Sequence, residues 1–100
     1  MNVTLNIRAD QRRARDFAWE SVKGIREDVQ AFYLDGLAML RRGKAAGLDK
    51  DALDLMARAL HDAIGGCIGK MEGTLDKAGC ALDPAQVDRS ELDAFLEEVK

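Results

Sequence analysis

The residues that could carry out catalysis are few in this 100-residue sequence. His61 is the only histidine, and the two cysteines, Cys67 and Cys80, lie thirteen positions apart without CxxC spacing. On one helix, His61 and Cys67 would point about 120° apart, which separates a nucleophile from its base. The same spacing provides no tetrahedral set of zinc ligands. Ser21 and Ser90 have no candidate base near them in the sequence.

Motifs that bind nucleotides or cofactors are also missing. The sequence has no Walker loop and no GxGxxG after a strand. We therefore expect no enzymatic activity, no cofactor and no metal. The opening MNVTLNIRAD lacks the pattern of a secretory signal, and no apolar run approaches the ~18–20 residues of a membrane span. These features predict a cytoplasmic protein with reduced thiols and no membrane partner.

Composition and apolar spacing predict an all-α fold. With 47% hydrophobic and 33% charged residues, the chain should fold as a single domain. Aromatic residues make up only 5%, which argues against a β-sandwich or barrel. We expect a long antiparallel helical hairpin, one or two short C-terminal helices and a short extended N-terminal arm. Two helices of about 30 residues would each be about 45 Å long, so the hairpin should be elongated.

The expected elements are an arm over 1–9, helices over 10–42 and 49–78, and short helices within 84–99. The arm is suggested by the alternation of Val3, Leu5 and Ile7. The first helix shows a heptad pattern, made by Ala18, Val22, Ile25, Val29, Phe32, Gly36 and Met39. The second helix has a similar series, Leu53, Met56, Leu60, Ile64, Cys67, Met71 and Leu75.

Polar residues and glycines suggest where these helices begin and end. Asp10 and Asp49 are candidate N-caps. Gly43 and Gly79 are candidate C-terminal stops, because glycine readily takes the left-handed conformation. The pair Asp83-Pro84 is a start signal for the C-terminal helices.

A row of glycines stands inside the second expected helix. Gly65, Gly69 and Gly73, with Gly66 beside them, would form a bare ridge on one face. Each interior glycine costs up to about 1 kcal/mol relative to alanine. One interpretation is close packing on the first helix, near Phe17 or Trp19. The other is a contact surface for another chain, or a mobile break in the helix.

The stretch from 31 to 40 is apolar on nearly every face of a helix. Tyr33, Leu34 and Leu37 lie outside the heptad pattern, and a two-helix hairpin cannot cover them all. Either the C-terminal helix folds over them or a second subunit does. A homodimer is therefore one expectation, and these three residues are candidate contacts.

Charge is distributed unevenly along the chain. Residues 1–50 have ten Lys and Arg against seven Asp and Glu, whereas residues 51–100 have five against eleven. Arg12, Arg13 and Arg15 could contact phosphates or an acidic protein, or form a solvated face. Asp10 and Asp16 stand among them, and the sequence pI of about 5.1 opposes nonspecific binding of nucleic acid, so direct nucleic-acid binding is not expected.

The C-terminal segment is rich in carboxylates. Its acidic residues include Asp88, Glu91, Asp93, Glu97 and Glu98. One interpretation is a solvent-exposed face, and the other is an acidic patch that competes for a basic DNA- or RNA-binding surface. The candidate partner-binding residues are Arg12, Arg13, Arg15, Tyr33, Leu34, Leu37, Gly65, Gly69, Gly73, Asp88, Glu91 and Asp93.

Three features of the sequence together resemble the profile of small phage-encoded anti-CRISPR proteins. They are the helical hairpin over 10–78, the glycine ridge and the carboxylate-rich tail over 83–98. That family shares no common motif, so the resemblance covers the whole chain only as a profile and transfers no residue role. It implies a non-catalytic inhibitor, acting in the cytoplasm of the host cell. Such an inhibitor binds subunits of a larger ribonucleoprotein, the CRISPR effector complex, and blocks recognition of target DNA. The alternative is a homodimeric helical DNA-binding or adaptor protein that uses the Arg-rich first helix.

Overall fold

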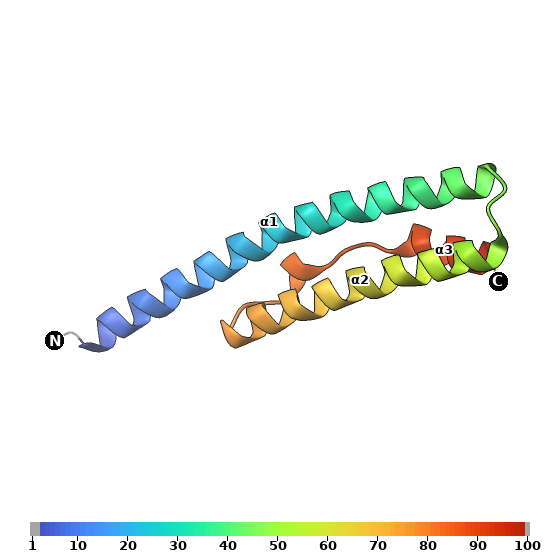
Figure 1. Cartoon of the computed structure of the whole chain (residues 1–100). Helices are drawn as coiled ribbons and strands as arrows, with labels where there is room; N and C mark the ends of the chain where they lie inside the picture. Colours follow the sequence, from blue (N-terminus) through green and yellow to red (C-terminus); the bar gives the residue numbers. More distant parts are fainter. Residues whose placement is uncertain (1–2, 100) are drawn as a thin grey trace.

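The chain folds as a helical hairpin with a C-terminal segment packed along it (Figure 1). The computed structural model describes residues 3–99, with side chains described from residue 9 onward. Its elements are α1 (Val3–Ala45), α2 (Lys50–Lys77), the 3₁₀ helix η1 (Asp83–Ala85) and α3 (Ser90–Glu98). Between residues 3 and 99 there is no strand. The predicted all-α hairpin is confirmed, and so are the short helices predicted within 84–99.

The molecule is a rod. Its principal extents are 70 × 18 × 16 Å, and its radius of gyration is 18.6 Å, compared with about 13 Å for a compact domain of this length. The length comes from α1, which has 43 residues against 28 in α2. The N-terminal part of α1 therefore extends past the far end of α2 (Figure 1). The predicted elongation is confirmed.

The start of α1 corrects the predicted arm. α1 begins at Val3, so an extended arm over 3–9 and an N-cap at Asp10 are both wrong; Met1 and Asn2 lie outside the described residues. No glycine or proline precedes Gly24, so no residue of the kind that interrupts a helix stands in this stretch. Three alternating apolar residues are too short a pattern to override that continuity.

The turn between α1 and α2 also differs from the prediction. α1 runs through Gly43 to Ala45, and the left-handed residue is Gly47, with φ 86°. Gly43 stays helical, and a Cβ there would lie 3.4 Å from the side chains of Leu48 and Leu53. Gly43 therefore lies at the contact with the start of α2 and does not end α1.

The predicted ends of α2 are confirmed. The Asp49 side chain accepts a hydrogen bond of 3.0 Å from the Asp51 backbone N–H. Beyond the last turn, Gly79 has φ 75°, a left-handed conformation that glycine adopts without steric cost. These two signals fix where α2 begins and where the chain leaves it.

The side chains that join α1 to α2 follow an eleven-residue repeat. Buried positions with this spacing are Ala18, Val29 and Leu40, and Val22 and Tyr33, in α1, and Leu53, Ile64 and Leu75, and Leu60 and Met71, in α2. Such a repeat corresponds to about 3.67 residues per turn, close to the ~3.6 of a straight helix. The two helices therefore pack along a nearly straight line.

The predicted heptad pattern is consequently wrong for part of both helices. Ile25, Phe32 and Met39 were expected at the contact between the helices, but they are 50%, 56% and 61% exposed. Met56 and Cys67 of α2 are exposed as well. A seven-residue series drifts about 20° per heptad around a straight helix, so it leaves the line that the core follows.

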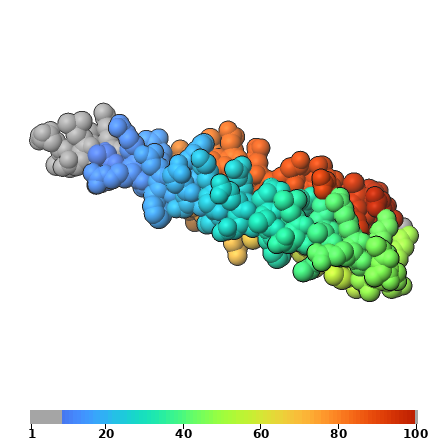
Figure 2. Space-filling model, turned by 90° about the horizontal axis from the view of Figure 1, so that it is seen from above, coloured from blue at the N-terminus to red at the C-terminus, as the bar shows by residue number. Residues whose placement is uncertain are grey.

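The C-terminal segment completes the core from one side of the hairpin. η1 and α3 bury Ala85, Leu92 and Phe95, and the residue after α3, Val99, joins them in the same cluster as α1 and α2. Seen from above α1, this segment lies along one edge of the rod (Figure 2). The core is therefore built from three layers on this side of the hairpin.

The glycines of α2 do not pack against α1. A Cβ at Gly66, Gly69 or Gly73 would meet nothing within 4 Å, and at Gly65 it would meet only the Arg89 guanidinium, at 3.3 Å. The interpretation of the ridge as a close contact with the first helix is therefore wrong, and α2 is continuous across it. Close approach occurs instead at Gly36, where a Cβ would lie 2.9 Å from both terminal carbons of Leu60.

This contrast predicts different responses to added methyl groups. Gly66→Ala should stabilise the protein by up to about 1 kcal/mol, because it raises helix propensity without a clash. Gly36→Ala should be less stable than Gly66→Ala, since Leu60 must move. Urea unfolding followed by circular dichroism measures both. Equal gains from the two substitutions would contradict the close approach at Gly36.

Candidate functional site

Two of the predicted arginines meet at a hollow where α1 passes the end of α2. Arg12, Arg15 and Trp19 line it, together with Asp16 and the turn residues 79–81, and its volume is about 350 Å³. The turn is held against α1, since the Cys80 thiol donates a hydrogen bond of 3.5 Å to the backbone carbonyl oxygen of Arg15. Trp19 is half-buried, so an apolar wall stands beside two cationic groups.

A second hollow lies next to the first. Residues 77–79 of α2 and its turn line it with Gln11, Ala14 and Arg15, and its volume is about 410 Å³. Arg15 therefore borders both hollows. Lys77 adds a further cation in the last turn of α2, where the helix dipole favours positive charge. We call Arg12, Arg13, Arg15, Trp19 and Lys77 the basic end.

The arginines of the basic end form no ion pair within the described part of the chain, although Asp16 lines the same hollow. The guanidinium groups of Arg12, Arg13 and Arg15 form no ion pair or hydrogen bond with any described residue. By contrast, Arg41 and Arg58 each pair with a carboxylate. A guanidinium group binds carboxylates and phosphates through paired N–H donors, so the basic end has unused capacity for an anionic partner.

The spacing of these arginines suits discrete anions better than a continuous phosphate chain. Arg13 follows Arg12 directly, so the two side chains point about 100° apart around α1. Asp10 and Asp16 lie among the arginines, and the chain as a whole has a net charge of −3. A nucleic-acid site normally presents a continuous positive stripe.

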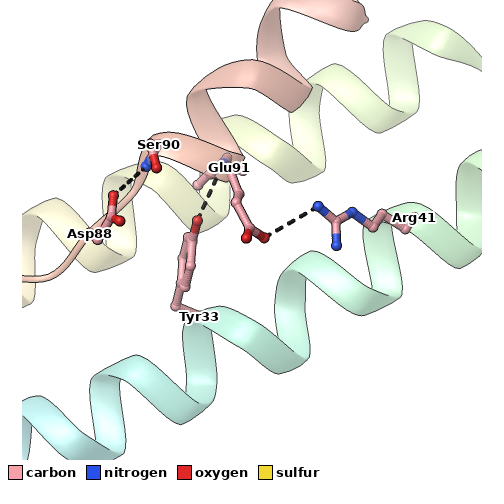
Figure 3. Close-up of polar contacts among 6 residues, drawn as sticks. Tyr33, Arg41, Asp88, Ser90 and Glu91 are labelled. Carbon is pink, nitrogen blue, oxygen red and sulfur yellow. Dashed lines mark hydrogen bonds and ion pairs between the residues drawn. The ribbon is translucent and has the colours of Figure 1, made fainter.

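Two of the predicted contact residues belong to the core instead. Tyr33 and Leu37 are 2% and 1% exposed, so their assignment to a partner surface is wrong. The C-terminal segment covers them, which answers the question that the sequence left open. The Tyr33 hydroxyl accepts a hydrogen bond of 3.1 Å from the Leu92 backbone N–H (Figure 3). Leu34, in contrast, remains 51% exposed.

Burial changes the titration of Tyr33. Desolvation raises the pKa of its phenol above the ordinary 10.0, and the Leu92 N–H opposes this by favouring the phenolate. The carboxylates of Glu91, Asp88 and Asp93 raise the pKa further. The neutral phenol is therefore the form that fits the core.

The predicted acidic residues make exposed contacts around the C-terminal segment. Asp88 accepts a hydrogen bond of 3.0 Å from the Ser90 backbone N–H, which lowers the pKa of Asp88 (Figure 3). Glu91 pairs with Arg41 at 3.3 Å (Figure 3), and Asp93 lies 3.8 Å from His61. Of the three carboxylates, Glu91 therefore has a cationic partner, Asp93 lies near an imidazole and Asp88 has a local backbone hydrogen bond.

A further ion pair fastens the other end of α3. Lys44 donates to Glu98 at 2.8 Å, and its ammonium lies 5.9 Å from the centre of the Phe95 ring. The hydrogen bond from Lys44 lowers the pKa of Glu98, and the positive charge of Lys44 lowers it further. Both side chains are at least half exposed, so the pair contributes little to stability.

The histidine and the cysteines stay apart. His61 lies between two carboxylates, with Nδ1 3.7 Å from Asp62 and Nε2 3.8 Å from Asp93. Cys67 and Cys80 are free thiols, as predicted. Cys67 is exposed and lines a groove with Ser21, away from His61.

The side of the hairpin opposite the C-terminal segment is a surface that sequence reasoning missed. Ile25 of α1 and Cys67 and Lys70 of α2 line a shallow groove there, with a volume of about 230 Å³. Phe32 and Met39 follow Ile25 in a seven-residue series and continue its line along α1. The open face is our name for the exposed apolar set Ile25, Phe32, Met39, Met56 and Cys67. Its signal in the sequence was the heptad series, which we had assigned to the core.

The hydrogen bond of Tyr33 predicts the stability of two variants. Tyr33→Phe should lower the free energy of unfolding by about 1 kcal/mol, because the Leu92 N–H loses its buried partner. The control Arg41→Gln removes an exposed ion pair, and its effect should be smaller. Urea unfolding measures both, and a larger loss for Arg41→Gln would contradict this assignment.

Because Tyr33 is the only tyrosine, alkaline titration reports it directly. We expect the phenolate absorbance of the folded protein to appear at a higher pH than in urea-unfolded protein, since burial raises the pKa of Tyr33. A folded pKa above the unfolded pKa means that the folded state holds the proton longer. Stability should therefore fall as pH rises above the ordinary tyrosine pKa. Superimposable titrations of folded and unfolded protein would contradict burial of the hydroxyl.

Neither a metal centre nor a membrane span is found among the described residues. No group of three or more His, Cys, Asp or Glu side chains there is arranged to hold a metal ion. No helix in this part of the chain is both long enough and apolar enough to cross a bilayer. In comparisons with known proteins, the chain has no match to a protein-family model, a curated protein or a solved structure.

Proposed function

We propose that this protein acts without catalysis, by binding an acidic surface of another protein through its basic end. The observation that carries the proposal is the pair of guanidinium groups of Arg12 and Arg15 in the hollow beside Trp19, which form no ion pair with any described residue. Arginine and tryptophan are enriched among the residues that dominate binding energy at protein interfaces. A carboxylate of the partner would enter the hollow between Arg12 and Arg15, with the indole of Trp19 against its aliphatic part.

The rest of the fold supports an interaction role. Within the described part of the chain, no charged side chain is buried, and the hollows of the surface are shallow. The rigid helices hold the basic end toward one extremity of a 70 Å rod, where a larger protein can approach without meeting the rest of the molecule. Arginines on an ordered helix lose less conformational entropy on binding than the same residues on a flexible loop.

The partner class that we propose follows from the resemblance to anti-CRISPR proteins. Binding to a subunit of a CRISPR effector complex would obstruct recognition of target DNA. The profile of a small, acidic, helical chain supports this partner. The ion pair of Glu91 with Arg41 and the contact of Asp93 with His61 favour contact with a partner through the arginines rather than through the acidic tail.

A charge-reversal experiment tests the basic end. The double variant Arg12→Glu/Arg15→Glu should lose at least about tenfold in affinity for its protein partner, because two guanidinium contacts become repulsive. Arg42→Glu/Lys50→Glu makes the same change in net charge at the opposite end of the rod and should bind as wild type does. Pull-down from host lysate with each immobilised protein, quantified by mass spectrometry, compares them. Equal capture by all three proteins would refute the proposal.

Gel-shift measurements separate a protein partner from nucleic acid. We expect wild-type protein to leave duplex DNA unshifted, and to prevent a CRISPR effector loaded with its guide RNA from shifting its target DNA. A salt-sensitive shift of DNA alone that Arg12→Glu/Arg15→Glu abolishes would favour the DNA-binding alternative. Unimpaired target binding by the effector from the same host would refute the proposed partner.

A further inference from the structure

We infer that the open face binds a second copy of this chain, related to the first by a two-fold axis parallel to the length of the rod. In this arrangement α1 of each protomer lies over α2 of the other. The inference concerns a different surface from the basic end and does not depend on the proposed function.

The first argument is the number and the alignment of exposed apolar side chains. Ile25, Phe32 and Met39 are between 50% and 61% exposed, and Met56 of α2 is 47% exposed. Their heptad spacing on α1 is the pattern by which helices dock lengthwise on other helices. The core already uses the eleven-residue series, so this second series has no partner within the described chain.

The second argument is that the C-terminal segment occupies the other side. Leu92 meets Tyr33 there, Glu91 meets Arg41 and Asp93 meets His61. No segment between residues 3 and 99 crosses the open face, where the groove bordered by Ile25 and Cys67 lies. The hairpin therefore has a third layer on one side only.

The third argument is charge, which selects the occupant and its orientation. On α1, Asp28 lies between Ile25 and Phe32 at helical spacings of three and four, and Asp35 lies likewise between Phe32 and Met39. On α2, Lys70 lines the groove beside Cys67. The α1 edge of the open face thus carries two carboxylates and the α2 edge carries a lysine, so the face is complementary to its own copy.

The positions of these charged residues along the length of the rod determine which symmetry axis is favoured. Lys70 lines the same groove as Ile25, and Asp28 is one helical turn from Ile25. Rotation about an axis parallel to the rod preserves the level along it, so this rotation brings Lys70 of one protomer near Asp28 of the other. The alternative two-fold axis, perpendicular to the rod, places α1 over α1 in opposite directions. It sets the acidic edge that carries Asp28 and Asp35 against its own copy.

The size of the face predicts a weak dimer. Residues 21–42 of α1 span about 33 Å at ~1.5 Å per residue, and the rod is 18 Å wide. The face thus measures about 600 Å² per protomer, so the total buried area is about 1,200 Å², at the low end for a specific interface. The proposed rotation also places both basic ends at the same extremity of the dimer.

Analytical ultracentrifugation over a wide concentration range tests the inference. We expect wild-type protein to show a reversible monomer–dimer equilibrium. Phe32→Glu should weaken it by about tenfold or more, because a charge replaces a central apolar contact. Leu34→Glu is the matched control: position 34 is 51% exposed but points to another side of α1, so this variant should dimerise as wild type does.

A charge swap tests the orientation. Asp28→Lys and Lys70→Asp should each weaken the dimer, and Asp28→Lys/Lys70→Asp should restore it, with circular dichroism verifying that each variant is folded. Protein that stays monomeric at all concentrations would overturn the inference, as would dissociation by Leu34→Glu to the same extent as by Phe32→Glu. Failure of the double variant to restore the dimer would overturn the proposed orientation. None of these outcomes alters the charge-reversal test of the basic end.

Discussion

The packing of α1 against α2 depends on apolar side chains that return to one side of a straight helix with an eleven-residue period. This period keeps the two helices in contact along α2 and does not impose the left-handed supercoil of a seven-residue repeat. It also decides which apolar residues are left over. Those that follow a seven-residue period rotate away from the contact line, and they collect on a side of the hairpin that no other described element covers.

The C-terminal segment gives this hairpin its asymmetry. η1 and α3 fill one side with Ala85, Leu92 and Phe95, and the Tyr33 hydroxyl meets the polar start of α3 within an otherwise apolar core. The surrounding ion pairs are exposed and add little energy. They do, however, pair carboxylates of the acidic tail within the molecule, which leaves the arginines at the far end as the unpaired charged groups that we assign to binding.

Much of the fold could be predicted from local signals. The long helices, the Asp49 cap and the Gly79 stop follow from residue types whose effects act within one helical turn. The face that each helix buries could not be predicted in the same way, because seven-residue and eleven-residue apolar series coexist in α1. Only the partner helix selects between them. Gly36 was correctly placed at the contact between the helices, where it meets Leu60, but Gly43 was misread as a helix stop.

The candidate site could be predicted only in part, for the same reason. Arg12, Arg13 and Arg15 were identified by their charge, but the hollow beside Trp19 exists only because the turn after α2 comes back to meet α1. For Tyr33 and Leu37 the sequence left two possible covers, the C-terminal helix or a second subunit. The C-terminal segment provides the cover, and its position depends on contacts distant in sequence.

The glycines of α2 that no side chain covers lower the free energy of local opening in the C-terminal half of this helix. At Gly66, Gly69 and Gly73 water reaches the peptide groups directly, and each glycine gains more backbone freedom than other residues when the helix frays. The free energy of local opening is therefore lower in this half of α2 than beside Leu53 and Ala57. Within α2, amide hydrogens after Gly65 should therefore exchange with solvent faster than those beside Leu53 and Ala57.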